Sequence, residues 1–137
     1  MKYLYFAYGS NLDIGQMRKR CPGAETVSAA VLKNWRLVER CYADIEKADG
    51  ECVHGALYSV TEDDLAALDF YEGYPALYTR ETVSVTDRDG VERRALVYTM
   101  TALYKQRSRA EGYSEDYRAV CSAGARAWGI PDAFAEK

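Results

Sequence analysis

The sequence predicts an α+β fold in which a mixed, mostly antiparallel sheet of six to seven strands curls or closes into a small barrel beside about three helices. Short stretches rich in aromatic and β-branched residues recur along the chain and indicate strands. Three stretches with helical periodicity lie among them in irregular order. The first strand leads into a helix, and a strand followed by a helix can pair in parallel with a later strand, which would make the sheet mixed. With 137 residues, 48% of them hydrophobic, we expect one domain over 1–137.

The first unit is predicted to be a strand, a turn and a helix. The stretch "YLYFAY" (3–8) has the composition of a short buried strand, and "LDIGQMRKRC" (12–21) has that of a helix ended by the Pro-Gly pair that follows. Between them, Ser10 or Asn11 is expected to cap the helix.

The next region is predicted to be rich in strands. The stretch "TVSAAVLKNWRLVER" (26–40) indicates extended structure that bends near Asn34. The stretch "YADIEKADGECVHGALYSV" (42–60) favours two strands on either side of Asp49-Gly50, a dipeptide typical of tight turns.

A helix is predicted over 62–73. Thr61 is its expected N-cap, acidic residues occupy the first turn, and Gly73 supplies the stop. Two strands then follow within 79–100, joined at Asp89-Gly90, and their alternation of apolar and polar residues predicts a hairpin.

The last part of the chain is predicted to hold a loop and one helix. The stretch "TALYKQRSRAEGY" (101–113) fits no periodic pattern and is assigned as a loop. Ser114 is the expected cap of a final helix that ends at Gly129 and packs one face on the sheet. That face is expected to comprise Tyr117, Val120, Cys121, Gly124 and Trp128.

Charge and hydropathy argue against several classes of partner. The net charge of −3 provides no basic field for nucleic acid, and the clusters "MRKRC" and "YKQRSR" are interpreted as solvated faces. The apolar runs are far shorter than the roughly 20 residues that span a bilayer, and the N-terminus lacks the pattern of a secretory signal. We expect a cytoplasmic protein that has neither nucleic acid nor membrane as a partner.

The four cysteines show no spacing typical of metal ligands, and we expect them to be reduced and mostly packed. Cys52 and His54, the only histidine, alternate along a predicted strand and can therefore face the same way. A nucleophilic Cys/His pair is thus one alternative, although nothing in the sequence marks a residue that would orient it.

Glu72 is an unusual charge in its predicted position. Leu65, Leu68 and Glu72 follow one another at helical spacing, so the carboxylate continues the stripe that should face the core. Burial and the negative end of the helix should both raise its pKa, which suits a proton shuttle near neutral pH. Alternatively, the side chain turns to solvent or pairs with an arginine such as Arg80.

The tetrapeptide Tyr8-Gly9-Ser10-Asn11 offers a complementary feature. A strand that ends here and leads into a helix presents free backbone N–H groups, which suit a carboxylate or an oxyanion. Gly9 permits close approach of a ligand to the backbone. A capped turn without a ligand is the other interpretation.

Taken together, these features resemble the gamma-glutamylcyclotransferases. "YFAYGSNL" (5–12) is similar to the family's N-terminal signature, and "GALYSVTEDDLAALDFYEGYPALY" (55–78) is similar to its second motif, with an "LDxxEG" stretch. "ALVYTM" and "GARAWGIP" extend the resemblance over nearly the whole chain. The family's mixed α+β domain with a small barrel-like sheet agrees with the predicted fold.

The resemblance implies that Glu72 is the catalytic acid/base and that Tyr8, Gly9, Ser10 and Asn11 form the substrate-binding loop. Two further pocket residues are implied, Tyr98 and Tyr78. The site needs no metal or cofactor, and its partner is a small gamma-glutamyl substrate. "YGSNL" is closer to the enzymes acting on gamma-glutamyl amino acids or amines than to the glutathione-specific branch. His54 departs from the family, where an aromatic residue is common.

The implied reaction is cyclisation of a gamma-glutamyl compound to 5-oxoproline with release of an amine. A non-catalytic module of the same fold that binds a small carboxylate is an alternative. A second alternative is the same chemistry used to remove a gamma-glutamyl protecting group in a biosynthetic pathway. A third is a hydrolase built on Cys52 and His54. The amine that leaves and the oligomeric state are not encoded in any pattern of the sequence.

Overall fold

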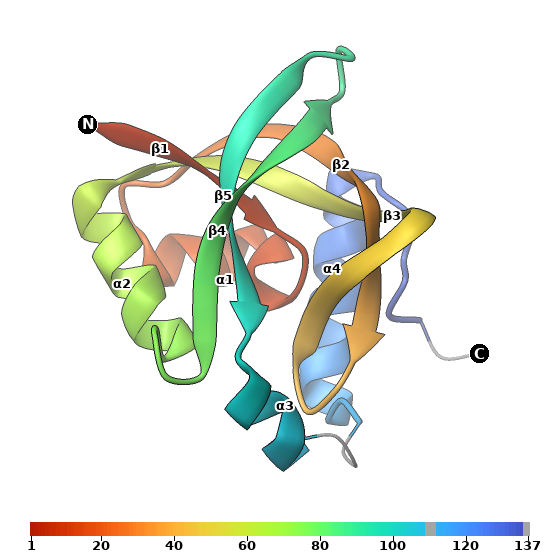
Figure 1. The fold of residues 1–137 in the computed structure, drawn as a ribbon. Coiled ribbons are helices and arrows are strands. Elements are labelled where there is room, and N and C mark those ends of the chain that lie inside the picture. Colours follow the sequence, from red (N-terminus) through yellow and green to blue (C-terminus); the bar gives the residue numbers. More distant parts are fainter. Residues whose placement is uncertain (109–111, 136–137) are drawn as a thin grey trace.

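The computed structural model describes residues 1–108 and 112–135, and within them it has five strands, four α-helices and one 3-10 helix. In chain order, the elements are β1 (Lys2–Ala7), η1 (Ser10–Leu12), α1 (Ile14–Arg20), β2 (Glu25–Glu39), β3 (Ala43–Thr61), α2 (Glu62–Glu72), β4 (Tyr78–Asp87), β5 (Glu92–Met100), α3 (Ala102–Ser108) and α4 (Glu115–Trp128). Figure 1 shows the strands crossing at the centre, with α2 and α4 on different sides of them.

The strands form a closed barrel in the order β1-β3-β2-β4-β5. The β1 strand runs antiparallel to β3 and parallel to β5, where Tyr5 lies opposite Leu96. The predicted α+β class and mixed, barrel-like sheet are confirmed. The predicted numbers are wrong in detail, since the described residues hold five strands instead of six to seven and four α-helices instead of three.

The strand count differs because two predicted breaks are irregularities inside long strands. The predicted bend at Asn34 is confirmed: Asn34 has a φ of 66°, and the β2–β3 register shifts between Lys33 and Trp35. The predicted turn at Asp49-Gly50 is wrong, because β3 continues through it. Gly50 N–H donates to the Asn34 side-chain oxygen at 3.1 Å, so the dipeptide belongs to a bulge that faces Asn34.

The β4–β5 hairpin forms where it was predicted. The two strands pair from Tyr78 with Met100 to Thr86 with Glu92, and Gly90 in the turn has a φ of 81°. In Figure 1 the tip of this hairpin projects beyond the barrel, whereas its other end lies near the C-terminal end of α2.

The α2 helix has the predicted boundaries. Thr61 accepts a hydrogen bond from Asp64 N–H while the Asp64 side chain accepts from Thr61 N–H, which makes a capping box. Gly73 ends the helix in the left-handed conformation. Leu65 and Leu68 are buried as predicted, so α2 presents the expected stripe to the barrel.

Two short helices differ from the predictions. Residues 102–108 form α3 instead of a loop, with the Thr101 hydroxyl accepting from Tyr104 N–H at 3.3 Å; 109–111 lie outside the described residues. The predicted cap by Ser10 or Asn11 is also wrong. Those two residues form η1, and Asp13 caps α1 by accepting from Gly15 N–H at 3.3 Å.

The α4 helix packs against both the barrel and η1. Ser114 and Gly129 bound it as predicted, and Cys121 and Ala125 join the core cluster that contains residues from all five strands. A Cβ atom at Gly124 would lie 2.5 Å from Asp13 N, so the helix and the turn after β1 are in close contact. Trp128 Nε1–H also donates to Leu12 O at 2.9 Å. Contacts with α4 therefore hold the turn after β1 in place.

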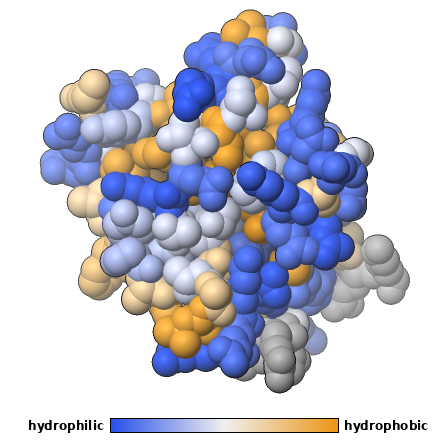
Figure 2. All heavy atoms as spheres, in the orientation of Figure 1, coloured by the Kyte–Doolittle hydropathy of each residue, from blue (hydrophilic) through white to orange (hydrophobic). Residues whose placement is uncertain are grey.

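The two faces of β1 are both covered, which explains its apolar sequence. Phe6 packs into the core cluster under α4, whereas Tyr5 and Ala7 pack into a second cluster that includes residues of α1 and α2. Figure 2 shows mainly hydrophilic side chains on one outer face, with apolar ones in separate groups. Over the described ranges, none of the helices has the length and apolarity that a membrane span requires.

Candidate active site

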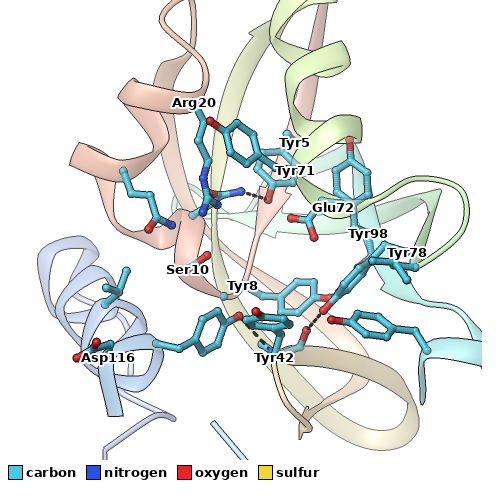
Figure 3. A pocket seen from close by; sticks show the side chains of 18 residues that line it. Tyr5, Tyr8, Ser10, Arg20, Tyr42, Tyr71, Glu72, Tyr78, Tyr98 and Asp116 are labelled. Carbon is cyan, nitrogen blue, oxygen red and sulfur yellow. Dashed lines mark hydrogen bonds between the residues drawn. The ribbon is translucent and has the colours of Figure 1, made fainter. Parts of the chain in front are cut away.

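A cavity of about 510 Å³ lies beside the C-terminal end of β1 (Figure 3). This volume falls in the range typical of small-molecule sites. Its described lining includes all seven residues that the sequence singled out. The lining residues are Tyr5, Tyr8, Gly9, Ser10, Asn11, Gln16, Arg20, Tyr42, Ala43, Tyr71, Glu72, Leu77, Tyr78, Tyr98, Tyr104, Asp116, Tyr117 and Val120.

Glu72 points into the cavity from the last turn of α2, with Arg20 on one side and Tyr98 and Tyr78 on the other (Figure 3). Among the described residues, no group forms a hydrogen bond or an ion pair with its carboxylate. Burial raises the pKa of Glu72 to about 7, and the nearby positive charge of Arg20 opposes part of that shift. The carboxyl can therefore exchange a proton at neutral pH.

The structure contradicts both alternative interpretations of Glu72. Its side chain is partly buried and faces the cavity, so it is not turned to bulk solvent. Arg80 pairs instead with Asp69, through N–O distances of 2.7 and 2.8 Å. Asp69 also accepts from the Tyr98 hydroxyl at 2.6 Å. Because Asp69 precedes Glu72 by three residues on α2, this network holds the turn that carries Glu72.

The turn formed by Gly9, Ser10 and Asn11 makes another wall of the cavity. As the start of η1, it leaves backbone N–H groups without acceptors within the helix. Asn11 fixes the turn through three contacts: its carbonyl accepts from the Tyr58 hydroxyl at 2.7 Å, its Nδ2 donates to the Tyr5 hydroxyl at 3.0 Å, and its Oδ1 accepts from Arg20 at 2.8 Å.

The three predicted pocket tyrosines direct their O–H hydrogens to protein acceptors. Tyr8 donates to Tyr98 O at 2.7 Å, Tyr78 donates to Ala43 O at 2.9 Å, and Tyr98 donates to Asp69. Burial raises the pKa of each phenol well above its ordinary value, so all three are neutral. What such a hydroxyl still offers to a ligand is an oxygen lone pair.

Sequence reasoning missed the donors on α1. Arg20 belongs to the cluster "MRKRC" that was interpreted as a solvated face, yet it lines the cavity. Gln16, one turn earlier, lines it too, and its Nε2 is buried without a hydrogen-bond partner in the described part of the chain. Their spacing of four residues on α1 was the available signal, since it puts both side chains on one helix face.

Cys52 and His54 lie outside the described lining of the cavity. They face the same way on β3, with Sγ 3.7 Å from Nε2, and Cys52 is exposed. His54, which stands where an aromatic residue is common in the family, therefore does not alter the cavity wall. The cysteines are free; Cys21 and Cys121 are buried, whereas Cys41 is only partly buried.

Three comparisons with known proteins agree on one family. The family model described as gamma-glutamyl cyclotransferase, AIG2-like, matches residues 5–119. The mouse gamma-glutamylcyclotransferase is 29% identical over 148 residues, which cover 98% of this chain and 76% of the mouse protein. The human protein of the same name is 28% identical with the same coverage. A solved structure of a gamma-glutamyl cyclotransferase superposes with a TM-score of 0.85 at 27% identity, covering 96% of this chain and 82% of its own.

Proposed function

The chain belongs to the gamma-glutamyl cyclotransferase, AIG2-like family, and we propose that it cyclises a gamma-glutamyl amino acid or gamma-glutamylamine to 5-oxoproline with release of the free amine. The observation that carries this proposal is the division of the cavity around Glu72. Hydrogen-bond donors of η1 and α1 lie on one side of Glu72, whereas the Tyr78 and Tyr98 hydroxyl oxygens lie on the other.

A divided cavity of this kind suits the zwitterionic head of a gamma-glutamyl compound. The donors can bind negatively charged oxygen, and they comprise the N–H groups of the turn, Gln16 and Arg20. The substrate's ammonium group needs acceptors, which are the Glu72 carboxylate and the lone pairs of Tyr78 and Tyr98. In the proposed binding mode, these acceptors hold the nitrogen that must lose a proton.

The proposed mechanism uses Glu72 to carry a proton from the attacking nitrogen to the departing nitrogen. The Glu72 carboxylate removes a proton from the substrate's α-ammonium, and the resulting amine attacks the side-chain amide carbonyl, which forms the ring C–N bond. The carbonyl then re-forms and the carbon–nitrogen bond to the leaving amine breaks as Glu72 delivers the proton to the departing nitrogen. The ring nitrogen loses its second surplus proton to the freed amine, which is released as an ammonium ion. Backbone N–H groups of Gly9 to Asn11 stabilise the oxyanion that develops on the carbonyl oxygen. Because both reacting groups belong to one molecule, positioning contributes much of the rate.

A substrate panel tests the proposed function. The wild-type protein is incubated with gamma-glutamyl amino acids, gamma-glutamylamines and glutathione, and 5-oxoproline and free amine are measured by mass spectrometry. We expect equimolar 5-oxoproline and amine from at least one amino acid or amine conjugate. If no conjugate yields product, the cyclisation proposal fails and a non-catalytic binding module is the better account.

The pH dependence of activity should report the titration of Glu72. Only the carboxylate form can accept the ammonium proton, so kcat/KM should rise with pH through an apparent pKa near 7 and level off above it. This is measured with saturating and subsaturating substrate between pH 5 and pH 9. A rate that is unchanged between pH 5.5 and pH 8 would contradict the proposed role.

A further inference from the structure

Arg20 has no carboxylate partner, although it is the only cationic side chain among the described residues that line the cavity. Other arginines near the site are paired. Arg80 binds Asp69 with an N–O distance of 2.7 Å, and Arg40 binds the buried Asp44 at 3.1 Å. Within the described ranges, no carboxylate oxygen lies within ion-pair distance of Arg20. A partly buried guanidinium without an anion is costly unless a ligand supplies one.

The Arg20 side chain is held in place without using most of its donors. Its Nη1 donates to Asn11 Oδ1 at 2.8 Å, and its guanidinium carbon lies 4.7 Å from the centre of the Tyr71 ring. A guanidinium has five N–H donors in a planar fork, so the bond to Asn11 leaves several for a ligand. Figure 3 shows Arg20 and Tyr71 next to each other on the side of the cavity opposite Tyr78.

Arg20 and Glu72 carry opposite charges at the cavity and can bind different groups of a ligand. The two side chains enter from α1 and α2, and they are near enough for the charge of Arg20 to lower the pKa of Glu72. Yet they form no ion pair within 4 Å. The space between them can therefore receive a group that carries both signs of charge, with its carboxylate toward Arg20 and its ammonium toward Glu72.

We propose that Arg20 binds the α-carboxylate of the gamma-glutamyl substrate through its free N–H groups, an inference that rests on the proposed function for its choice of ligand. The planar fork matches a carboxylate in a bidentate geometry. If Arg20 takes the carboxylate, the N–H groups of Gly9 to Asn11 are left for the oxyanion of the reacting carbonyl.

This assignment restricts the substrate class. The α-carboxyl must be free, because a peptide bond there would remove the charge and one oxygen that Arg20 needs. A gamma-glutamyl linkage between two protein chains is therefore not a substrate as it stands. The reaction that supplies the substrate must therefore leave the α-carboxyl of the gamma-glutamyl group free.

Binding of two ring compounds tests the inference without using catalysis. 5-Oxoproline carries the carboxylate, and pyrrolidin-2-one is the same ring without it. Both are titrated into wild-type protein and Arg20→Gln, and dissociation constants are read from two-dimensional NMR spectra. We expect Arg20→Gln to weaken 5-oxoproline binding about 10- to 100-fold, as expected for loss of a charged hydrogen-bond pair, and to leave pyrrolidin-2-one binding within about twofold of the wild type.

Two further variants serve as controls. Arg18→Gln makes the same change at an exposed position of α1 and should leave both dissociation constants unchanged. Arg20→Lys keeps the charge without the planar fork and should fall between wild type and Arg20→Gln. Equal weakening of both compounds, unchanged 5-oxoproline binding in Arg20→Gln, or no binding of 5-oxoproline to the wild type would each overturn the inference.

The outcome also separates this inference from the proposed reaction. If 5-oxoproline binding depends on Arg20 but the substrate panel yields no product, the carboxylate site stands and the proposed catalysis fails. If the panel yields 5-oxoproline but Arg20→Gln binds that compound like the wild type, the catalysis stands and the role of Arg20 fails.

Discussion

Replacing Glu72 with glutamine should lower kcat about 10²- to 10⁴-fold, the usual contribution of a general acid/base. Glutamine has nearly the same shape and keeps its polarity, so the walls of the cavity should remain in place. It cannot take a proton from the substrate's ammonium or return one to the leaving amine. The measurement is the initial rate of 5-oxoproline formation at saturating substrate, for the wild type and Glu72→Gln at pH 8.

Stability measurements distinguish a loss of catalysis in Glu72→Gln from a loss of folding. Burial raises the folded-state pKa of Glu72 from 4.5 to about 7, so stability from this group is full below pH 4.5 and is lost as pH rises through 7. At pH 8 the ionised side chain therefore destabilises the fold, and Glu72→Gln should be at least as stable as the wild type. Glu62→Gln, at an exposed position in the first turn of α2, is the matched control. Wild-type activity in Glu72→Gln would remove Glu72 from the mechanism.

Replacing Gly9 with valine should lower kcat/KM about 100-fold or more, because displacing a positioning group by about 1 Å can cost that much. A Cβ atom at this position would lie 2.9 Å from the Tyr117 hydroxyl oxygen and 3.3 Å from Ala43 Cβ. The turn, Tyr117 or both must then move. The valine methyl groups would also occupy the approach to the backbone N–H groups.

Gly15→Val is a suitable comparison for this variant. Gly15 lies on α1, where the nearest atom to an added Cβ is Asp13 Oδ1 at 3.7 Å, an ordinary contact. We expect Gly15→Val to keep kcat/KM near that of the wild type. Steady-state kinetics of both variants, together with thermal unfolding, distinguish a displaced turn from general destabilisation. A Gly9→Val protein with unchanged kcat/KM would exclude the turn from substrate binding.

The sequence predicted best those elements whose boundaries are set by neighbouring residues. The α2 helix is bounded by a capping box at Thr61 and by Gly73, and the hairpin within 79–100 turns at Asp89-Gly90. Each of these signals acts within a few residues and needs no tertiary partner. The position of Glu72 on the inward face of α2 followed from the same local periodicity.

The errors arose where tertiary pairing overrides a local signal. Asp49-Gly50 is a good turn dipeptide, but β2 pairs with β3 on both sides of it, so the dipeptide forms a bulge instead. The α3 helix has seven residues and too few turns to show a periodicity.

The lining of the cavity could be predicted only in part. The sequence signals gave the turn after β1 and the end of α2, but Arg20 lies in a run of basic residues that resembles any solvated helix face. What distinguishes it is its approach to Asn11 and Tyr71, and this depends on how α1 docks beside α2. The hydroxyl directions of Tyr8 and Tyr78 are likewise set by distant backbone carbonyls, and that of Tyr98 is set by the Asp69 side chain.

Cyclisation by the substrate's own amine is the central claim, and a reaction in ¹⁸O-labelled water tests it most directly. The wild-type protein is given the best conjugate from the panel in H₂¹⁸O, and the products are analysed by mass spectrometry. Intramolecular attack predicts 5-oxoproline without ¹⁸O and no free glutamate, because water takes no part in bond formation. Free glutamate with one ¹⁸O atom in its side-chain carboxyl would instead show hydrolysis and contradict the account.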